Sequence, residues 1–150
     1  TQDWLLELFA KHGIGAERLL LHTKIYLAQI LKLSSQIDLA LDPFPYNGAT
    51  ASMFGLWMGV PVVTLRGDRT VARLGAAIMS RFGLSQFIAL DEQDYVDIVL
   101  RWAADLSGLN TLRQSLRGRM EGIQDDPEKF RLSVEEAMVD IWAHWCRLEK

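Results

Sequence analysis

Cysteine and histidine are scarce in this sequence. Among 150 residues there is one cysteine, Cys146, and there are three histidines. A lone cysteine excludes a disulfide within the chain, and it makes a reducing compartment, the cytoplasm, the expected location. The histidines are scattered and show no metal-ligand spacing, so we expect neither a metal ion nor a cofactor.

Long apolar runs and charge of one sign are also missing. No apolar run approaches the roughly 20 residues that span a bilayer, and no charged leader with an apolar segment predicts a signal peptide. The net charge is −3, with acidic and basic residues interleaved, which argues against nucleic-acid and membrane partners. With 49% hydrophobic and 23% charged residues, the chain fits one globular domain with a sizeable core.

Hydrophobic periodicity predicts short strands alternating with helices. We expect strands at 18–22, 37–41, 60–65 and 87–90. We expect helices from Trp4 to a stop at Gly13, and at 24–35, 50–58, 71–82 and 91–104, with Asp91 as an N-cap. Residues 107–149 are predicted to be helical, with a break near Asp125-Asp126-Pro127.

This alternation predicts an α/β fold, a parallel sheet flanked by helices, with a helical C-terminus. Ligands of such sheets bind beyond the carboxyl ends of the strands, here the loops after His22, Leu41, Leu65 and Leu90. Doubly wound domains usually begin with a strand and this chain begins with a helix. Because it also lacks an initiator methionine, we expect residues 1–150 to be a single domain that is truncated at its N-terminus.

One segment carries chemical information: a proline-stiffened loop that turns at Asn47-Gly48 and leads into a helix. The small residues Ala49, Thr50, Ala51 and Ser52 open that helix. Free N–H groups and the positive end of the helix dipole can bind a phosphate there, with the Thr50 and Ser52 hydroxyls adding hydrogen bonds. From the residues alone, an ordinary capped helix is the commoner alternative.

The same segment resembles the O-GlcNAc transferase-like (SPINDLY-like) glycosyltransferases, which have the GT-B fold. The similarity rests on Asp38 to Asp42, on Asn47-Gly48-x-Thr50, and on the run from Leu56 to Thr64. It continues through Gly67-Asp68, Arg73-Leu74-Gly75, Asp94-Tyr95 and Ile141-Trp142, and so covers nearly the whole chain.

The resemblance implies a Rossmann-like C-terminal half of a GT-B enzyme. That half binds a UDP-sugar, with the diphosphate at the helix that begins near Thr50. The implied reaction transfers N-acetylglucosamine or a related sugar to Ser or Thr of an acceptor protein. The implied partners are the upstream GT-B half and tetratricopeptide repeats of the same chain. The proposed base lies in that upstream part, so no catalytic residue is expected within these 150 residues.

Several positions depart from the family pattern. Ala51 stands where the family has a second threonine. Phe54 stands where it has a carboxylate that binds the ribose hydroxyls. The base-contacting Lys and His fall, in a loose alignment, at Leu27 and Ile30.

Two cations are further candidates for phosphate binding. Lys24 follows the expected strand at His22 and either contacts a phosphate or is a solvated loop charge. Arg73 either reaches an anion or pairs with Asp68. Trp142 and Trp145 are expected to pack in the core or against another domain.

Two functions of different classes remain open. The first is the donor-binding half of a glycosyltransferase, inactive as an isolated fragment. The second is a non-catalytic interaction or scaffold domain of the same fold, which Ala51 and Phe54 favour.

Overall fold

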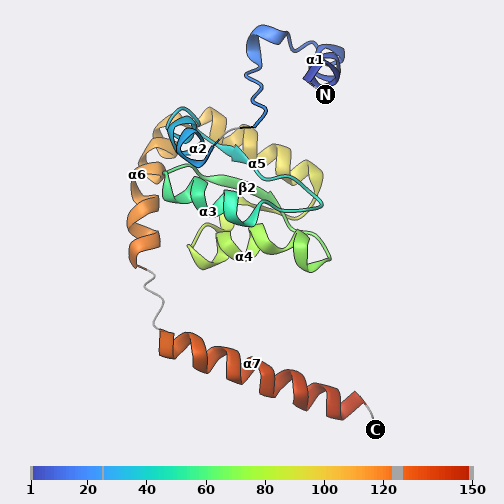
Figure 1. The fold of residues 1–150 in the computed structure, drawn as a ribbon, viewed down its shortest axis with the longest axis vertical. Coiled ribbons are helices and arrows are strands. Elements are labelled where there is room, and N and C mark those ends of the chain that lie inside the picture. The colour runs from blue at the N-terminus through green and yellow to red at the C-terminus, as the bar shows by residue number, and fades with distance from the viewer. Residues whose placement is uncertain (1, 25, 123–126, 149–150) are drawn as a thin grey trace. The chain divides into compact units, whose positions relative to one another are not determined.

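The computed structural model describes residues 2–24, 26–122 and 127–148, without the side chain of Leu27. The chain divides into two compact units, residues 1–36 and residues 37–150. Its helices and strands, labelled in Figure 1, are α1 (Gln2–Lys11), α2 (Leu27–Ser34), β1 (Ala40–Leu41), α3 (Ala49–Trp57), β2 (Val62–Leu65), α4 (Leu74–Arg81), β3 (Ile88–Ala89), α5 (Glu92–Ala104), α6 (Leu106–Gly122) and α7 (Pro127–Leu148). Three 3-10 turns lie between them, η1 (Ala16–Arg18), η2 (Thr70–Ala72) and η3 (Ser85–Phe87).

The first unit contains α1, η1 and α2. Gly13 follows α1 with φ 75°, and the Ile14 N–H donates to the Phe9 carbonyl at 3.1 Å. This arrangement is the left-handed glycine stop that the sequence predicted. Helix α2 confirms most of the helix expected at 24–35. The Gln29 side-chain oxygen accepts the backbone N–H of Tyr26, the N-cap residue of this helix, at 2.9 Å.

The prediction of a strand at 18–22 is wrong. Arg18 belongs to the turn η1, and residues 19–22 have no regular structure. Leu20 is 74% exposed. A strand needs a partner to bind its backbone groups, and no segment within the described ranges pairs with these residues. The short apolar run was therefore not enough to define a strand.

The second unit is built on three parallel strands in the order β1-β2-β3. Ala40 lies opposite Val62, and Thr64 lies opposite Ile88. The predictions near 37–41, 60–65 and 87–90 are thus confirmed as parallel neighbours. Only the last two residues of the first predicted strand are paired. Helix α3 connects the first parallel pair, and α4 connects the second.

Helices cover both faces of this sheet. Figure 1 shows α3 and α4 on one side of β2 and α5 on the other, and all three contact β2. Apolar side chains from the strands and helices fill the space between these layers. The buried cluster consists of Leu56, Val62, Val63, Met79, Phe82, Leu84, Phe87, Ala89, Tyr95, Ile98, Leu112 and Leu116.

Helix α6 closes the edge where the strands begin. Gly59 and Gly83, which precede β2 and β3, end their helices with φ 77° and 67°. The Arg113 Nε donates to the Gly59 carbonyl at 3.1 Å, and Arg119 donates to the Gly83 carbonyl at 3.2 Å. Arg113 also forms an ion pair with Asp38, which precedes β1. Because α6 lies at the amino edge, the carboxyl edge is formed by the loops after the strands and by the helix starts to which they lead.

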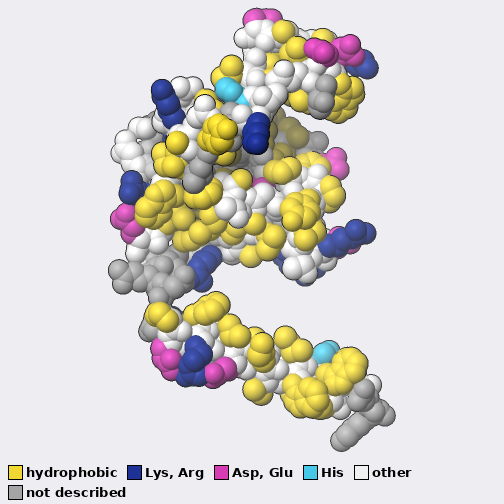
Figure 2. Space-filling model, in the orientation of Figure 1, with side chains coloured by type: hydrophobic (Ala, Val, Ile, Leu, Met, Phe, Trp, Pro, Cys, Tyr) yellow, Lys and Arg dark blue, Asp and Glu magenta, His cyan; other side chains and the backbone are white. Residues whose placement is uncertain are grey.

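The long C-terminal helical segment is confirmed as α6 and α7. Of the break expected near Asp125-Asp126-Pro127, the two aspartates lie outside the described residues, and Pro127 begins α7. Hydrophobic side chains run along α7 in Figure 2. Trp142 and Trp145 are 68% and 53% exposed, so they do not pack in the core of this chain. No helix in the described ranges is both long and apolar enough to cross a membrane.

Candidate functional site

Asp42 is the first residue after β1, and its carboxylate is buried at the carboxyl edge of the sheet. Only 3% of the residue is exposed. Its Oδ1 accepts the Gly48 N–H at 2.7 Å and the Ser52 hydroxyl at 3.2 Å. Its Oδ2 accepts the Thr64 hydroxyl at 2.7 Å. Hydrogen bonds to a charged group are stronger than neutral ones, so Asp42 ties β1, β2 and the start of α3 together.

Asn47 locks the same loop from its other end. The residue is 1% exposed, its Nδ2 donates to the Pro43 carbonyl at 3.2 Å, and its Oδ1 accepts the Gly75 N–H at 3.2 Å. A Cβ at Gly75 would collide with the side chains of Thr64 and Asp42. The loop therefore fits closely against α4, and residue 75 has room only for a hydrogen.

Tyr95 completes this network from α5. Its hydroxyl donates to the Asp42 carbonyl at 3.0 Å, and its ring packs edge-to-face against Phe44 at 5.5 Å between centroids. Burial, with a smaller contribution from the Asp42 charge, raises the pKa of Tyr95 to about 12. The phenol therefore stays protonated and keeps donating through the neutral range.

Helix α3 begins with unsatisfied backbone donors. Gly48 is its N-cap and provides no side-chain cap. In the part of the chain that the structure describes, the N–H groups of Ala49, Thr50 and Ala51 have no hydrogen-bond partner. The ordinary side-chain cap that the sequence left open is therefore not formed. Three free amides at the positive end of a helix, on the carboxyl edge of a parallel sheet, form a candidate anion site.

The two hydroxyls predicted at this site differ in their surroundings. Thr50 is exposed beside the free amides. Ser52 is 4% exposed, its hydroxyl donates to Asp42, and its N–H donates to the Gly48 carbonyl at 3.1 Å. Of the two residues, only Thr50 is exposed to solvent.

Arg73 lies just before α4, near the carboxyl end of β2. The sequence left open an ion pair with Asp68, and within the described residues that pair is not formed. Instead the Arg73 Nε donates to the Gly67 carbonyl at 3.1 Å. Arg73 also lines a hollow of about 320 Å³, whose walls are Arg66, Arg73, Ala76, Ala77, Ser80 and Ile88.

The remaining candidates lie in two different units. Lys24 is exposed in the segment before α2, Leu27 is the first residue of α2, and Ile30 is 37% exposed on the same helix. In the second unit, Phe54 is half-buried on α3 and does not belong to the buried cluster.

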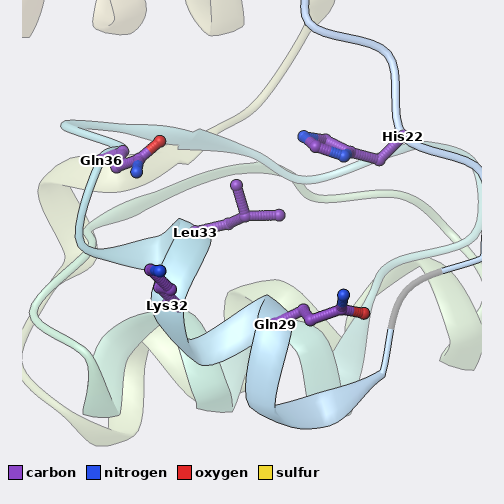
Figure 3. Close-up of a pocket in the computed structure, with 5 residues that line it drawn as sticks. All are labelled: His22, Gln29, Lys32, Leu33 and Gln36. Carbon is purple, nitrogen blue, oxygen red and sulfur yellow. The ribbon is translucent and has the colours of Figure 1, made fainter.

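A second hollow, which the sequence did not predict, belongs to the first unit. It measures about 310 Å³ and is lined by His22, Gln29, Lys32, Leu33 and Gln36. Figure 3 shows the His22 ring on the chain that precedes α2, with the other four side chains on α2 or just after it. Lys24 and Ile30 do not line it. No local motif marks this hollow, since it depends on how residue 22 folds back toward the helix.

The structure offers no metal centre in the ranges it describes: no group of three or more His, Cys, Asp or Glu side chains there could hold an ion. The buried Asp42 carboxylate is instead saturated by N–H and O–H donors.

Comparisons with known proteins show which family this chain resembles. The model of glycosyl transferase family 41 matches residues 2–124. A rice protein named "Probable UDP-N-acetylglucosamine--peptide N-acetylglucosaminyltransferase SPINDLY" is 38% identical over 75% of this chain and 12% of its own length. Its namesake from Arabidopsis thaliana is 35% identical over 77% of the chain and 13% of its own length.

A solved structure is similar as well. The Thermobaculum terrenum O-GlcNAc transferase mutant K341M has a TM-score of 0.82 and 32% sequence identity, over 99% of this chain and 29% of its own. The chain thus spans about an eighth of the curated relatives and less than a third of the solved enzyme. The family-wide match and the shared fold establish that this chain belongs to glycosyl transferase family 41.

Proposed function

We propose that this chain is the donor-binding half of a protein glycosyltransferase. In this proposal a UDP-sugar is the donor, N-acetylglucosamine or a similar sugar is transferred, and Ser or Thr of a protein accepts it. The sheet is the Rossmann-like layer of the C-terminal GT-B half, and the catalytic base belongs to the upstream half. Tetratricopeptide repeats of the same polypeptide would present the acceptor in the cytoplasm.

One observation carries the proposal: the three unpartnered N–H groups of Ala49, Thr50 and Ala51 at the carboxyl edge of the sheet. In the reaction, the acceptor hydroxyl forms a bond to the anomeric carbon while the bond to the diphosphate breaks. The hydroxyl proton passes to the base, and negative charge grows on the departing UDP. Fixed amide dipoles stabilise that charge without having to reorganise.

The roles within the site follow from exposure. The Thr50 hydroxyl adds a donor to a phosphate oxygen, while Asn47, Gly48 and Ser52 hold the loop behind it. Arg73 and Lys24 remain further candidates for the donor's negative charge. Phe54 offers a half-buried ring where a carboxylate would accept ribose hydroxyls.

The second candidate function is a scaffold domain that has lost donor binding. Phe54 favours it, because an aromatic ring cannot accept hydrogen bonds from a ribose. Ala51 favours it too, since alanine has no hydroxyl for the phosphate.

Calorimetric titration of the full-length protein with UDP and UDP-N-acetylglucosamine tests the proposal. Thr50→Ala removes one donor to a charged oxygen, which contributes roughly 1.5–3 kcal/mol, so UDP affinity should fall about ten-fold or more. Thr50→Ser keeps the hydroxyl and should bind nearly as wild type. Thr111→Ala is the matched control, because Thr111 is exposed on α6 with its hydroxyl bonded to the Ser107 carbonyl at 3.0 Å.

Phe54→Glu separates the two functions. If the ring faces the donor, the new carboxylate accepts the ribose hydroxyls and UDP affinity rises. If the ring packs internally, the same change buries a charge and lowers the melting temperature instead. Wild-type protein that binds no uridine nucleotide would support the scaffold. A Thr50→Ala protein that binds UDP as tightly as wild type would instead remove the start of α3 from the donor site.

A further inference from the structure

The most deeply buried carboxylate of the second unit lies directly behind the candidate anion site. Asp42 is 3% exposed and receives three hydrogen bonds, from the loop residue Gly48, from Ser52 of α3 and from Thr64 of β2. It does not face the free amides as a ligand would, because its own oxygens are occupied from the inside. A buried charge in this position can act on the site only through the residues that it binds.

The residues that Asp42 binds in α3 lie at the start of that helix. The helix has no side-chain cap, and the N–H of its N-cap residue Gly48 is bound by Asp42 from six residues upstream. One turn later the Ser52 hydroxyl is bound by the same carboxylate oxygen. Asp42 therefore binds the inner side of α3 at both ends of its first turn, at Gly48 and at Ser52. The amides between these two points, those of residues 49–51, are the ones left without a partner.

We propose that Asp42 is a positioning residue for the anion site: through Gly48 and Ser52 it fixes the first turn of α3 so that the three free amides converge on a diphosphate. Thr64 supports this function from β2, where it is fully buried and donates to the other carboxylate oxygen at 2.7 Å. The proposal rests on the proposed function for the identity of the ligand, but its geometry concerns any diphosphate.

Thr64 gives the sharpest test, because a fully buried strand residue cannot touch a ligand. Thr64→Val keeps the shape and removes the hydroxyl that orients Asp42. We expect it to weaken binding of inorganic diphosphate to the full-length protein by about three- to ten-fold, as one lost hydrogen bond to a charged group allows. Thr64→Ser keeps the donor and should restore binding to within about two-fold.

Asp42→Asn gives the larger effect. It removes the charge and turns an NH2 group toward groups that are themselves donors, so diphosphate affinity should fall at least ten-fold. The Gly48 amide should also exchange its hydrogen faster. Where this variant does not fold, the Thr64 pair carries the test alone.

Leu116→Ala is the control for general instability. Leu116 is 1% exposed within the core, on α6, which lies at the amino edge of the sheet, opposite the loop at 42–48. Its truncation should lower the melting temperature at least as much as Thr64→Val does, and leave diphosphate affinity unchanged at temperatures where all variants are folded.

Each outcome decides one question. Thr64→Val with wild-type affinity, or Leu116→Ala with an equal loss, overturns the positioning function. Wild-type protein that binds inorganic diphosphate but not UDP overturns the proposed donor and leaves the positioning function standing. Wild-type protein that binds neither overturns both, because the start of α3 is then no anion site.

Discussion

Replacing Gly75 by alanine tests how tightly the site is locked. The added methyl group would collide with the Thr64 hydroxyl and the Asp42 carboxylate, both buried and bonded to each other at 2.7 Å. Neither side chain can change its rotamer freely, because Thr64 is fully buried and Asp42 also binds Gly48 and Ser52. The methyl group must therefore push the loop at 42–48 away from α4 and break the hydrogen bond between Thr64 and Asp42.

The cost follows from two contributions. Overpacking a close-packed interior costs about 1–3 kcal/mol, and losing a hydrogen bond to a charged group costs roughly 1.5–3 kcal/mol. We therefore expect Gly75→Ala to lower the free energy of unfolding by about 3–5 kcal/mol. At about 2–4 °C per kcal/mol for a domain of this size, the melting temperature falls by roughly 6–20 °C.

The matched control is Gly118→Ala. Gly118 lies inside α6, and a Cβ there meets nothing within 4 Å. Alanine is the better helix former by about 0.8–1 kcal/mol, so this variant should melt slightly higher than wild type. Urea unfolding and calorimetry of the full-length protein give both values. A Gly75→Ala protein that is as stable as wild type would refute the close fit of the loop against α4.

Three further changes test other contacts. Burial raises the pKa of Tyr95 to about 12, above its ordinary value of 10.0. The stability that the protonated phenol contributes is therefore complete below pH 10 and is lost as the pH rises toward 12. In unfolding titrations, the free energy of unfolding of Tyr95→Phe should fall less steeply over this pH range than that of wild type. Asp91→Ala removes the N-cap of α5, whose carboxylate accepts an amide at 2.8 Å, and should cost about 1 kcal/mol in urea unfolding, whereas an unchanged midpoint would show that the cap is redundant. Arg113→Met keeps the aliphatic stem but leaves the Gly59 carbonyl without its side-chain donor, so the melting temperature should fall by a few degrees. UDP affinity should stay constant, because α6 lies at the edge of the sheet opposite the site.

The sequence predicted the elements whose signals are local. Asp91 caps α5, and Gly13, Gly59 and Gly83 stop helices with a left-handed residue. Each of these signals depends on neighbours within about five residues, so one sequence suffices to find it. The expected strand at 18–22 failed because a strand depends on a partner elsewhere, which a short apolar run does not reveal.

The candidate site divides in the same way. Thr50 and the free amides were predictable, since small residues after an Asn-Gly turn mark a helix start open to an anion. The function of Asp42 was not, because its partners Thr64 and Tyr95 lie 22 and 53 residues away. The available signal was its place: an aspartate directly after a strand is well positioned to cap the loop that follows.

The two ends of the sheet have different physical tasks. At the amino edge, Arg113 and Arg119 donate to the carbonyl groups of Gly59 and Gly83, which follow the ends of α3 and α4. At the carboxyl edge, Asp42 consumes the N–H of Gly48 and leaves the next three amides free. A carboxylate beside a helix start would by itself weaken anion binding, because both negative charges face the same dipole. The donors of Gly48, Ser52 and Thr64 offset part of the Asp42 charge from the inner side, and the diphosphate would approach from solvent, toward the free N–H groups and the exposed Thr50.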